Sequence, residues 1–398
     1  MCSGTIPVTK TPGIQRRRKS RFGCRNCKLR KVKCDESRPC CVNCQIYGVV
    51  CNFGFNVPDF QSLPEERTKK NVLKQFAIPS PQSSMGNCIW VADGATFYML
   101  NAHDQDLFNR FQCRTLHSLG GPEIVEIHNR HMLALSFKRP FLWHGMLAVT
   151  AVHDRYLGVT PTHRRSFCET YHWSQCTSLF KKSLGQPIKE EHKDPIWAAA
   201  STLGILAFSS INACPLEEAW PLGPPDSSDL EWLRLAAGKM RLWQLVNPLR
   251  ETSIFAPMAD TFTTMHQSLP IEGINGVLAE LKQLCMLDET STAYNNPYFR
   301  VAHGLSELLA TPVGQATLGK AMKFSTKILG EFKTLIERKD PIALTLLYLW
   351  YTRARECRWW IDIRATYEMP AIRTYLQRYY QDWGHVQKLL SRVDIGCL

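Results

Sequence analysis

The sequence lacks the features that would mark an exported, membrane-spanning or enzymatic protein. Its first 20 residues contain no apolar core and end in a basic run, so they predict no signal peptide. Residues 195–216 are free of charge but too rich in Ser, Thr and Asn for a transmembrane span, so we expect a buried helix and no membrane partner. No G-x-S-x-G, G-x-G-x-x-G, P-loop or H-E-x-x-H motif occurs, and we expect no enzyme.

Strand signals are also missing, which favours a helical fold. Clean period-2 patterns and Asn-Gly hairpin signals are absent, and residues 53–94 lack the heptads of a coiled coil. The Pro, Ser and Gly residues of 53–94 predict a linker, and residues 1–15 are expected to be disordered. In residues 95–398 apolar side chains recur at helical spacing, which predicts an all-α domain of eight or more helices.

Local signals predict several ends of these helices. Asp340 and Pro341 are typical of an N-cap and the first residue of a helix. Leu184-Gly185 predicts a helix C-terminus. Ser228, three residues before Glu231, predicts a capping box that opens another helix.

Acidic residues are absent from residues 16–33, which contain ten Lys and Arg residues. Residues 1–60 carry 12 of the 48 basic residues but only 3 of the 35 acidic ones, so they account for +9 of the net charge of +13. A basic head followed by a nearly neutral body predicts a polyanionic partner for the head.

Six cysteines in this head follow one spacing: Cys24-x2-Cys27-x6-Cys34-x6-Cys41-x2-Cys44-x6-Cys51. Structural zinc prefers four thiolates in a tetrahedron. Six sulfurs can therefore hold two zinc ions only if two cysteines bridge both ions. Cys24 and Cys41, which open the two C-x2-C-x6-C halves, are placed to bridge.

The two predicted ligand sets follow from this arrangement. One zinc would take Cys24, Cys27, Cys34 and Cys41, and the other would take Cys24, Cys41, Cys44 and Cys51. The segment is otherwise poor in apolar side chains, so its folding should depend on zinc. The few that it has are Leu29, Val32, Val42, Ile46 and Val50.

Three strings in the head resemble the fungal Zn2Cys6 binuclear cluster of transcription factors: residues 27–35 (CKLRKVKCD), 38–41 (RPCC) and 48–51 (GVVC). The resemblance implies a zinc-dependent DNA-binding domain over residues 16–52, made of two short helices. It also implies a regulator of RNA polymerase II genes that reads CGG-type half-sites in double-stranded DNA. In the frame of this family, the extra thiol Cys40 is not a ligand.

A short helix from Lys28 to Lys33 is expected to enter the major groove, where basic side chains donate to guanine. The resemblance implies that Lys31 and Arg30 meet the bases. The other basic residues are better suited to phosphate contacts: Lys28, Lys33, Arg25, Arg16, Arg17, Arg18, Lys19 and Arg21. The run 16–21 is also typical of a nuclear localisation signal, which predicts a nuclear protein.

Residues 139–153 (RPFLWHGMLAVTAVH) resemble a helix in the regulatory region of fungal zinc-cluster factors, most closely the group that includes sterol-uptake regulators. The resemblance implies that residues 95–398 form a regulatory or effector domain. Such a domain could form a homodimer and could bind a small hydrophobic effector. Residues 196–211 and 344–361 could line its pocket.

Two other interpretations stay open at this stage. The zinc module could bind RNA or buffer zinc, or it could be a targeting arm for a helical body of another function. Isolated histidines invite a metal site in the body, but we expect them to be packed or hydrogen-bonded: His128, His131, His144, His153 and His172. Target genes, the sign of regulation and the oligomeric state are not predicted.

Overall fold

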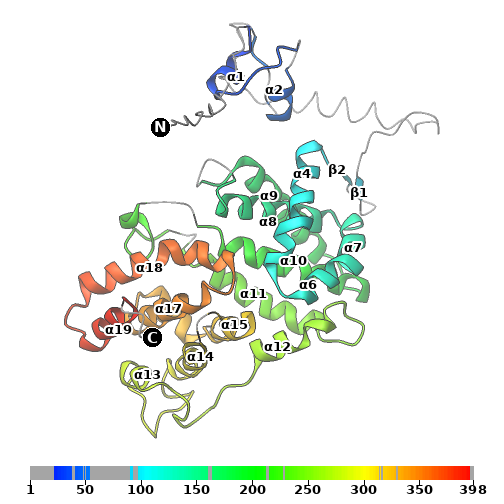
Figure 1. Ribbon diagram of the computed structural model, residues 1–398. Coiled ribbons are helices and arrows are strands. Elements are labelled where there is room, and N and C mark those ends of the chain that lie inside the picture. The colour runs from blue at the N-terminus through cyan, green and yellow to red at the C-terminus, as the bar shows by residue number, and fades with distance from the viewer. Residues whose placement is uncertain are drawn as a thin grey trace, which may run out of the picture. The chain divides into compact units, whose positions relative to one another are not determined.

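A computed structural model of the chain describes residues 22–37, 41–47, 49, 51–53, 90–92, 97–159, 164–211, 215–226, 229–312, 314, 317–328 and 330–394. These residues separate into two units, one within residues 1–87 and the other within residues 88–398 (Figure 1). Residues 1–15 and 54–89, for which we expected disorder and a linker, lie outside the described residues.

The first unit contains two short helices, α1 (Arg25–Leu29) and α2 (Val42–Tyr47). Its buried cluster consists of the six spaced cysteines and Val49, with Phe53 packed against it. Three of the apolar side chains named above remain largely outside this cluster: Leu29 is 50% exposed, Val32 38% and Val42 50%. The interior of the unit is therefore made mainly of sulfur.

The second unit begins with a small antiparallel ribbon of β1 (Trp90–Ala92) and β2 (Phe97–Met99), in which Trp90 pairs with Met99. No strand is expected from the sequence, and β1 falls within the predicted linker. Strands of three residues are too short for a period-2 pattern to stand out, which is why the sequence did not reveal them.

The rest of this unit is helical, so the predicted all-α character of the body is confirmed. In chain order its first elements are α4 (Ala102–Arg110), the π-helix η1 (Phe111–Thr115), α5 (Leu116–Leu119), α6 (Pro122–Ile127), the π-helix η2 (His128–Met132), α7 (Leu133–Phe137), α8 (Pro140–Tyr156), α9 (Phe167–Leu184) and α10 (Glu190–Phe208). They are followed by the 3-10 helix η3 (Leu216–Glu218), α11 (Glu231–Val246), the 3-10 helix η4 (Ala256–Met258), α12 (Ala259–His266), α13 (Ala279–Leu284) and α14 (Phe299–Leu309). The last elements are α15 (Leu318–Lys327), α16 (Glu331–Glu337), α17 (Pro341–Ala354), α18 (Trp359–Tyr379) and α19 (Gly384–Asp394).

Two helices lie at the centre of this unit. Nearly every residue of α8 is buried, and α8 packs on α9 and α10. Nearly every residue of α17 is buried as well, and α17 packs on α14 and α18. Figure 1 shows α4, α8 and α9 gathered in one part of the unit and α17, α18 and α19 in another, with α10 and α11 between them.

Two of the predicted helix ends are confirmed. The carboxylate of Asp340 accepts a hydrogen bond from the Ala343 N–H at 2.8 Å, and Pro341 is the first residue of α17. Gly185 follows the last residue of α9. The helix expected after Ser228 begins at Glu231, but Ser228 itself lies outside the described residues.

The stretch 195–216 includes most of α10, whose residues from Asp194 to Ala200 and from Leu206 to Phe208 are buried. This agrees with the expectation of a buried helix. In the part of the chain that the structure describes, no helix is long and apolar enough to cross a bilayer.

Two buried arginines hold the C-terminal end of α10. Arg364 of α18 donates from Nε to the Phe208 carbonyl at 2.7 Å and from Nη2 to the Ala207 carbonyl at 3.2 Å. Arg155 of α8 donates to the Ser209 carbonyl at 3.3 Å. Helix C-termini have unpaired carbonyls and a partial negative charge. An arginine there donates hydrogen bonds to the carbonyls, and its positive charge offsets the negative one.

Each of these arginines is also paired with a buried carboxylate. Arg155 makes two bonds of 3.0 Å with Glu169. Arg364 bonds Glu368, whose second oxygen accepts from the Tyr351 hydroxyl at 2.6 Å. The end of α10 is thereby tied to α8, α9, α17 and α18 by charge-assisted hydrogen bonds, which are stronger than neutral ones.

We expect Arg364→Leu to lower the free energy of unfolding by about 3–5 kcal/mol, because it leaves the Glu368 carboxylate buried without its cation. Urea denaturation followed by tryptophan fluorescence would measure this. Arg364→Leu/Glu368→Leu should recover part of the loss. Arg378→Leu, which removes an exposed pair with Glu217, is the control and should change stability far less. An equal effect of both single variants would contradict the role of the buried pair.

Candidate metal centre and nucleic-acid interface

The six spaced cysteines bring their sulfur atoms into two overlapping groups. One group contains Cys24, Cys27, Cys34 and Cys41, and the other contains Cys24, Cys41, Cys44 and Cys51. Within each group the four sulfurs lie within 4.8 Å of one another. The sulfurs of Cys24 and Cys41, which belong to both groups, are 3.7 Å apart.

The backbone repeats this arrangement after 17 residues. The Cys27 N–H donates to the Cys24 sulfur at 3.4 Å, and the Cys44 N–H donates to the Cys41 sulfur at 3.3 Å. Thus each C-x2-C pair opens a short helix with a sulfur as its cap. Such N–H···S bonds favour the thiolate form, which is the form that binds metal.

Side chains next to the cysteines in the sequence form hydrogen bonds between the two halves of the unit. The Asn52 side chain accepts from the Asn26 N–H at 2.7 Å. Asp35 accepts from the Val42 N–H at 3.0 Å, and Asn43 donates to the Lys33 carbonyl at 2.8 Å. These residues were not predicted from the sequence, because the spacing of the cysteines carries no signal for the side chains that support them.

The chemistry of this donor set fits zinc. Burial, and then the neighbouring thiolates of Cys24 and Cys41, raise the pKa of the Cys27 and Cys44 thiols. Several thiolates cannot share so small a volume unless a cation neutralises them. Zn²⁺ supplies that charge and accepts four sulfurs in a tetrahedron, and a thiol that coordinates it is deprotonated outright.

The basic residues of this unit lie on its surface. Arg25, Lys28, Lys31 and Lys33 are exposed, whereas Arg30 is partly buried and donates to the Asn43 carbonyl at 3.1 Å. The predicted helix from Lys28 to Lys33 is wrong in its extent, because α1 ends at Leu29. The chain leaves the helix there and turns back toward Cys34, which belongs to the same sulfur group as Cys27.

Lys31 occupies an unusual backbone conformation at this turn. Its φ is +56°, in the left-handed region that L-residues with a side chain rarely adopt. The Lys31 N–H donates to the Lys28 carbonyl and the Val32 N–H to the Cys27 carbonyl, both at 3.1 Å. This is the Schellman ending of a helix, in which glycine is the usual residue.

The second half of the repeat has that glycine in its sequence. Gly48 stands 17 residues after Lys31, and the Val49 N–H donates to the Cys44 carbonyl at 3.1 Å, as the Val32 N–H does to Cys27. A lysine therefore occupies a position where glycine would be unstrained. The run 16–21 and Cys40 lie outside the described residues.

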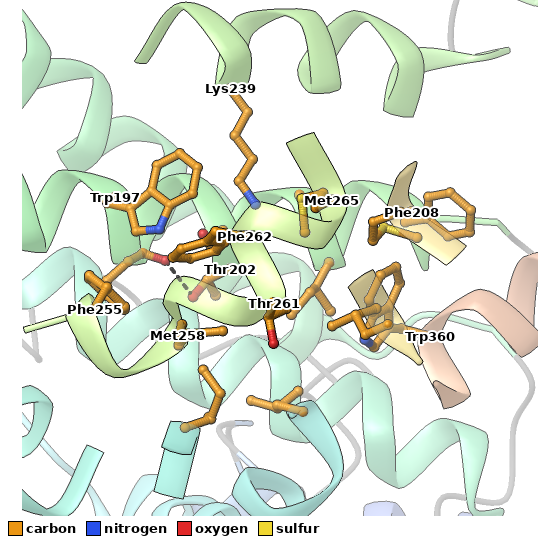
Figure 2. A pocket seen from close by; sticks show the side chains of 18 of the residues that line it. Trp197, Thr202, Phe208, Lys239, Phe255, Met258, Thr261, Phe262, Met265 and Trp360 are labelled. Atoms are coloured by element: carbon orange, nitrogen blue, oxygen red, sulfur yellow. Dashed lines mark hydrogen bonds between the residues drawn. The ribbon is translucent and has the colours of Figure 1, made fainter. Parts of the chain in front are cut away.

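The helical body contains an apolar cavity of about 280 Å³. Its walls come mainly from α10, α11, α12 and α15, with aromatic and methionine side chains such as Trp197, Phe262 and Met265 (Figure 2). Of the two segments predicted to line a pocket, residues 197–208 of α10 do so, but 344–361 contribute only Trp360. The reason is that α17, which covers most of 344–361, is the centre of the core and packs against other helices on all sides.

One residue of the cavity stands out by its charge. Lys239 of α11 lies in the wall with its ammonium nitrogen 4.7 Å from the centre of the Trp197 ring. Lys239 was not predicted as a site residue, although the sequence contains a signal for it. Trp232, Ala236, Lys239 and Trp243 follow helical spacing, so a lysine interrupts an otherwise apolar stripe.

The histidines of the body are packed or hydrogen-bonded where the structure shows their contacts. His144 and His172 share a contact between their Nδ1 atoms of 2.9 Å, and His172 Nε2 lies 3.2 Å from Asp104. His153 bonds Thr115 at 3.0 Å. Among the described residues, the groups suited to a metal ion consist of cysteines alone.

Comparison with known proteins identifies the first unit. Residues 22–55 match the model of the fungal Zn(2)-Cys(6) binuclear cluster domain. The chain is 55% identical over 42 residues, 11% of its length, to a Zn(2)-C6 fungal-type transcription factor of Gibberella zeae. It is 44% identical over 52 residues, 13% of its length, to the transcriptional regulatory protein UME6 of Saccharomyces cerevisiae.

A longer match is to the Zn(2)-C6 fungal-type transcription factor afumD of Aspergillus fumigatus, with 28% identity over 140 residues, 34% of this chain. The three matches span 8%, 6% and 33% of the respective relatives, so most of each relative is not covered. The resemblance of the body to the group of sterol-uptake regulators stays a prediction.

The match and the sulfur geometry agree. The N-terminal unit contains a domain that matches the fungal Zn(2)-Cys(6) binuclear cluster, which binds two zinc ions, and its sulfur groups are placed to hold them. The predicted zinc-cluster module and its two zinc ions are thus confirmed.

We expect Cys24→Ala to lose more zinc than Cys34→Ala, because Cys24 lies in both sulfur groups and Cys34 in one. Zinc per chain, measured on the full-length protein by atomic absorption, should fall well below two for Cys24→Ala, with loss of the fold of the unit. Cys113→Ala, at an exposed cysteine of the body, is the control and should keep two. Two zinc ions bound by Cys24→Ala would contradict bridging.

Proposed function

We propose that this chain is a nuclear, sequence-specific DNA-binding regulator of genes transcribed by RNA polymerase II. The observation that carries the proposal is the pair of four-sulfur groups beside a cluster of exposed lysines and arginines. The cluster of six thiolates and two Zn²⁺ is itself negative, so the surrounding basic side chains must supply the attraction to phosphate.

The two zinc ions are proposed to be held by the groups described above. Cys24, Cys27, Cys34 and Cys41 would hold one ion, and Cys24, Cys41, Cys44 and Cys51 the other. Zinc supplies the crosslinks of a unit that buries little besides sulfur. The metal thereby fixes the direction in which α1 and its basic side chains project.

Lys31 is the residue that we propose to read a base. It is exposed at the end of α1, and its left-handed backbone supports a requirement for its side chain. Arg30 has one donor engaged with Asn43, so it has fewer left for a base. We propose phosphate contacts for Lys28, Lys33 and Arg25 and for the run Arg16, Arg17, Arg18, Lys19 and Arg21.

The helical body is proposed to be the regulatory domain. Its apolar cavity supports the binding of a small hydrophobic effector, since such cavities are where small molecules bind. Dimerisation through the body stays a prediction, and sedimentation of the full-length protein would test it.

Selection from a randomised duplex pool by the zinc-loaded full-length protein, followed by sequencing, tests the function. We expect enrichment of a site with a CGG-type core, because lysine and arginine donors suit the two acceptors of guanine. A flat distribution across duplexes would contradict the proposal. A parallel selection with an RNA pool would show whether the unit binds RNA instead.

Lys31→Gly separates base reading from folding. Glycine adopts a φ of +56° without a steric penalty, so this change removes the side chain while it keeps the turn. We expect two zinc ions per chain and a loss of about 1–3 kcal/mol in binding to the selected site, with random DNA hardly affected. Quantitative DNA-binding titrations would measure both.

Lys28→Ala is the matched control for a phosphate contact. We expect it to weaken selected and random duplexes by similar factors and to reduce the salt dependence of log K by about one unit. If Lys31→Gly instead weakened both kinds of duplex equally, its role in base reading would be refuted.

A further inference from the structure

The cavity of the helical body places a positive charge among apolar side chains. Its described lining includes the apolar side chains of Trp197, Phe255, Met258 and Phe262. Among all the described lining residues, Lys239 is the only Lys or Arg. Figure 2 shows the Lys239 side chain running inward from α11, with its nitrogen at the inner end near Trp197 and Phe262. The charge therefore faces the cavity.

Lys239 has no anionic partner in the described part of the chain. No carboxylate there forms an ion pair with its nitrogen, and the ammonium group lies over the Trp197 ring. The Lys239 side chain is half-buried, and the loss of water around its nitrogen lowers the pKa of Lys239 to about 8. At that pKa the amine remains largely protonated near neutral pH, so the cavity contains a cation that the protein does not neutralise.

Such an arrangement costs stability unless something compensates for it. Buried charges in proteins are usually paired, and a hydrocarbon side chain of similar length would fill the wall more favourably. In contrast, several buried arginines and carboxylates of this unit form ion pairs, as Arg155 does with Glu169 and Arg364 with Glu368. Lys239, which lines the cavity, differs from these residues because no described carboxylate pairs with it.

A second polar residue lines the same cavity. His128 of η2 is 4% exposed, lines the cavity, and its Nε2 atom has no hydrogen-bond partner. Burial lowers the pKa of His128 to about 4, so the ring is neutral and offers one hydrogen bond without a charge. The hydroxyls of Thr202 and Thr326, by contrast, bond helix carbonyls.

We propose that this cavity binds an apolar organic acid, whose carboxylate pairs with Lys239 and whose hydrocarbon part contacts Trp197, Phe255 and Phe262. One ammonium matches a single negative charge, whereas a phosphate ester would need more donors. The volume of about 280 Å³ lies near the small end of ligand pockets, at about 300–1,000 Å³, which favours a compact acid. That this acid is the effector rests on the proposed regulatory function, but its binding does not.

Three probes of one chain length test the proposal on the zinc-loaded full-length protein. They are decanoate, 1-decanol and decylammonium, each below its micelle concentration, with binding followed by tryptophan fluorescence and calorimetry. We expect decanoate to bind at least about tenfold more tightly than decanol, since a charge-assisted bond is worth that factor or more. Decylammonium should bind most weakly, because its charge repels Lys239.

Variants assign the preference to one residue. Lys239→Met should abolish the preference for decanoate while decanol still binds, and Lys239→Arg should keep it. Arg241→Met, at an exposed position of the same helix, removes the same charge and should leave all affinities unchanged. The midpoint of urea denaturation should not fall for Lys239→Met, because the change removes a desolvated charge that has no anionic partner among the described residues.

Several results would overturn the proposal. Equal affinities of decanoate and decanol for the wild-type protein would do so, as would a preference that survives Lys239→Met or a failure of all three probes to bind. Duplex binding by the same protein is measured in parallel. Selective duplex binding without a preference for decanoate would refute this inference alone. A preference for decanoate without selective duplex binding would refute the proposed regulatory function alone.

Discussion

Coordination of metal by six sulfurs is the interaction on which the N-terminal unit depends. Its buried cluster contains one valine besides the cysteines, and Leu29, Val32 and Val42 face solvent to a large degree. A unit with so little hydrophobic burial cannot offset the entropy of ordering its chain. Zinc supplies the missing free energy, because the ion binds the folded arrangement of thiolates far better than the unfolded one. Every direction in which a basic side chain projects is therefore set by the metal.

The same metal frame allows the two halves to differ in the residue that ends each helix. Both halves cap a helix with a sulfur and close it with an N–H to carbonyl bond five residues back. The repeat in sequence puts Gly48 in one half and Lys31 in the other. Glycine satisfies the turn without strain, whereas lysine adopts it at a cost of roughly 1–2 kcal/mol. Zinc coordination outweighs this cost, so the first half can carry a side chain where the second carries none.

Much of the architecture could be predicted from the sequence, and particular residues show why. Asp340 and Pro341 predicted the start of α17, and Leu184-Gly185 the end of α9, because caps are local and depend on neighbouring residues. The cysteine spacing predicted the two sulfur groups, because tetrahedral coordination admits few arrangements. What depends on contacts far apart in the chain was missed. The extent of α1 is decided by where Cys34 must return, and Asn52 reaches Asn26 across 26 residues.

The cavity shows the same division between local and distant information. The helices 190–208 and 231–246 can be expected from periodicity, but their crossing, which brings Lys239 over the Trp197 ring, cannot. Periodicity also treats a lysine within an apolar stripe as a minor irregularity. Only the fold shows that its nitrogen lies in the wall of a cavity rather than in solvent.

Apolar walls and a single cation make different contributions to recognition. Contact with Trp197, Phe255 and Phe262 stabilises any hydrophobic occupant in proportion to the area it buries, and so hardly separates an acid from the matching alcohol. Lys239 separates them, because an alcohol leaves the ammonium unpaired while a carboxylate neutralises it. Discrimination of this kind comes from the cost of the wrong occupant as much as from the gain of the right one. A protein that keeps an unpaired lysine in an apolar cavity thereby exchanges stability in the empty state for selectivity in the occupied one.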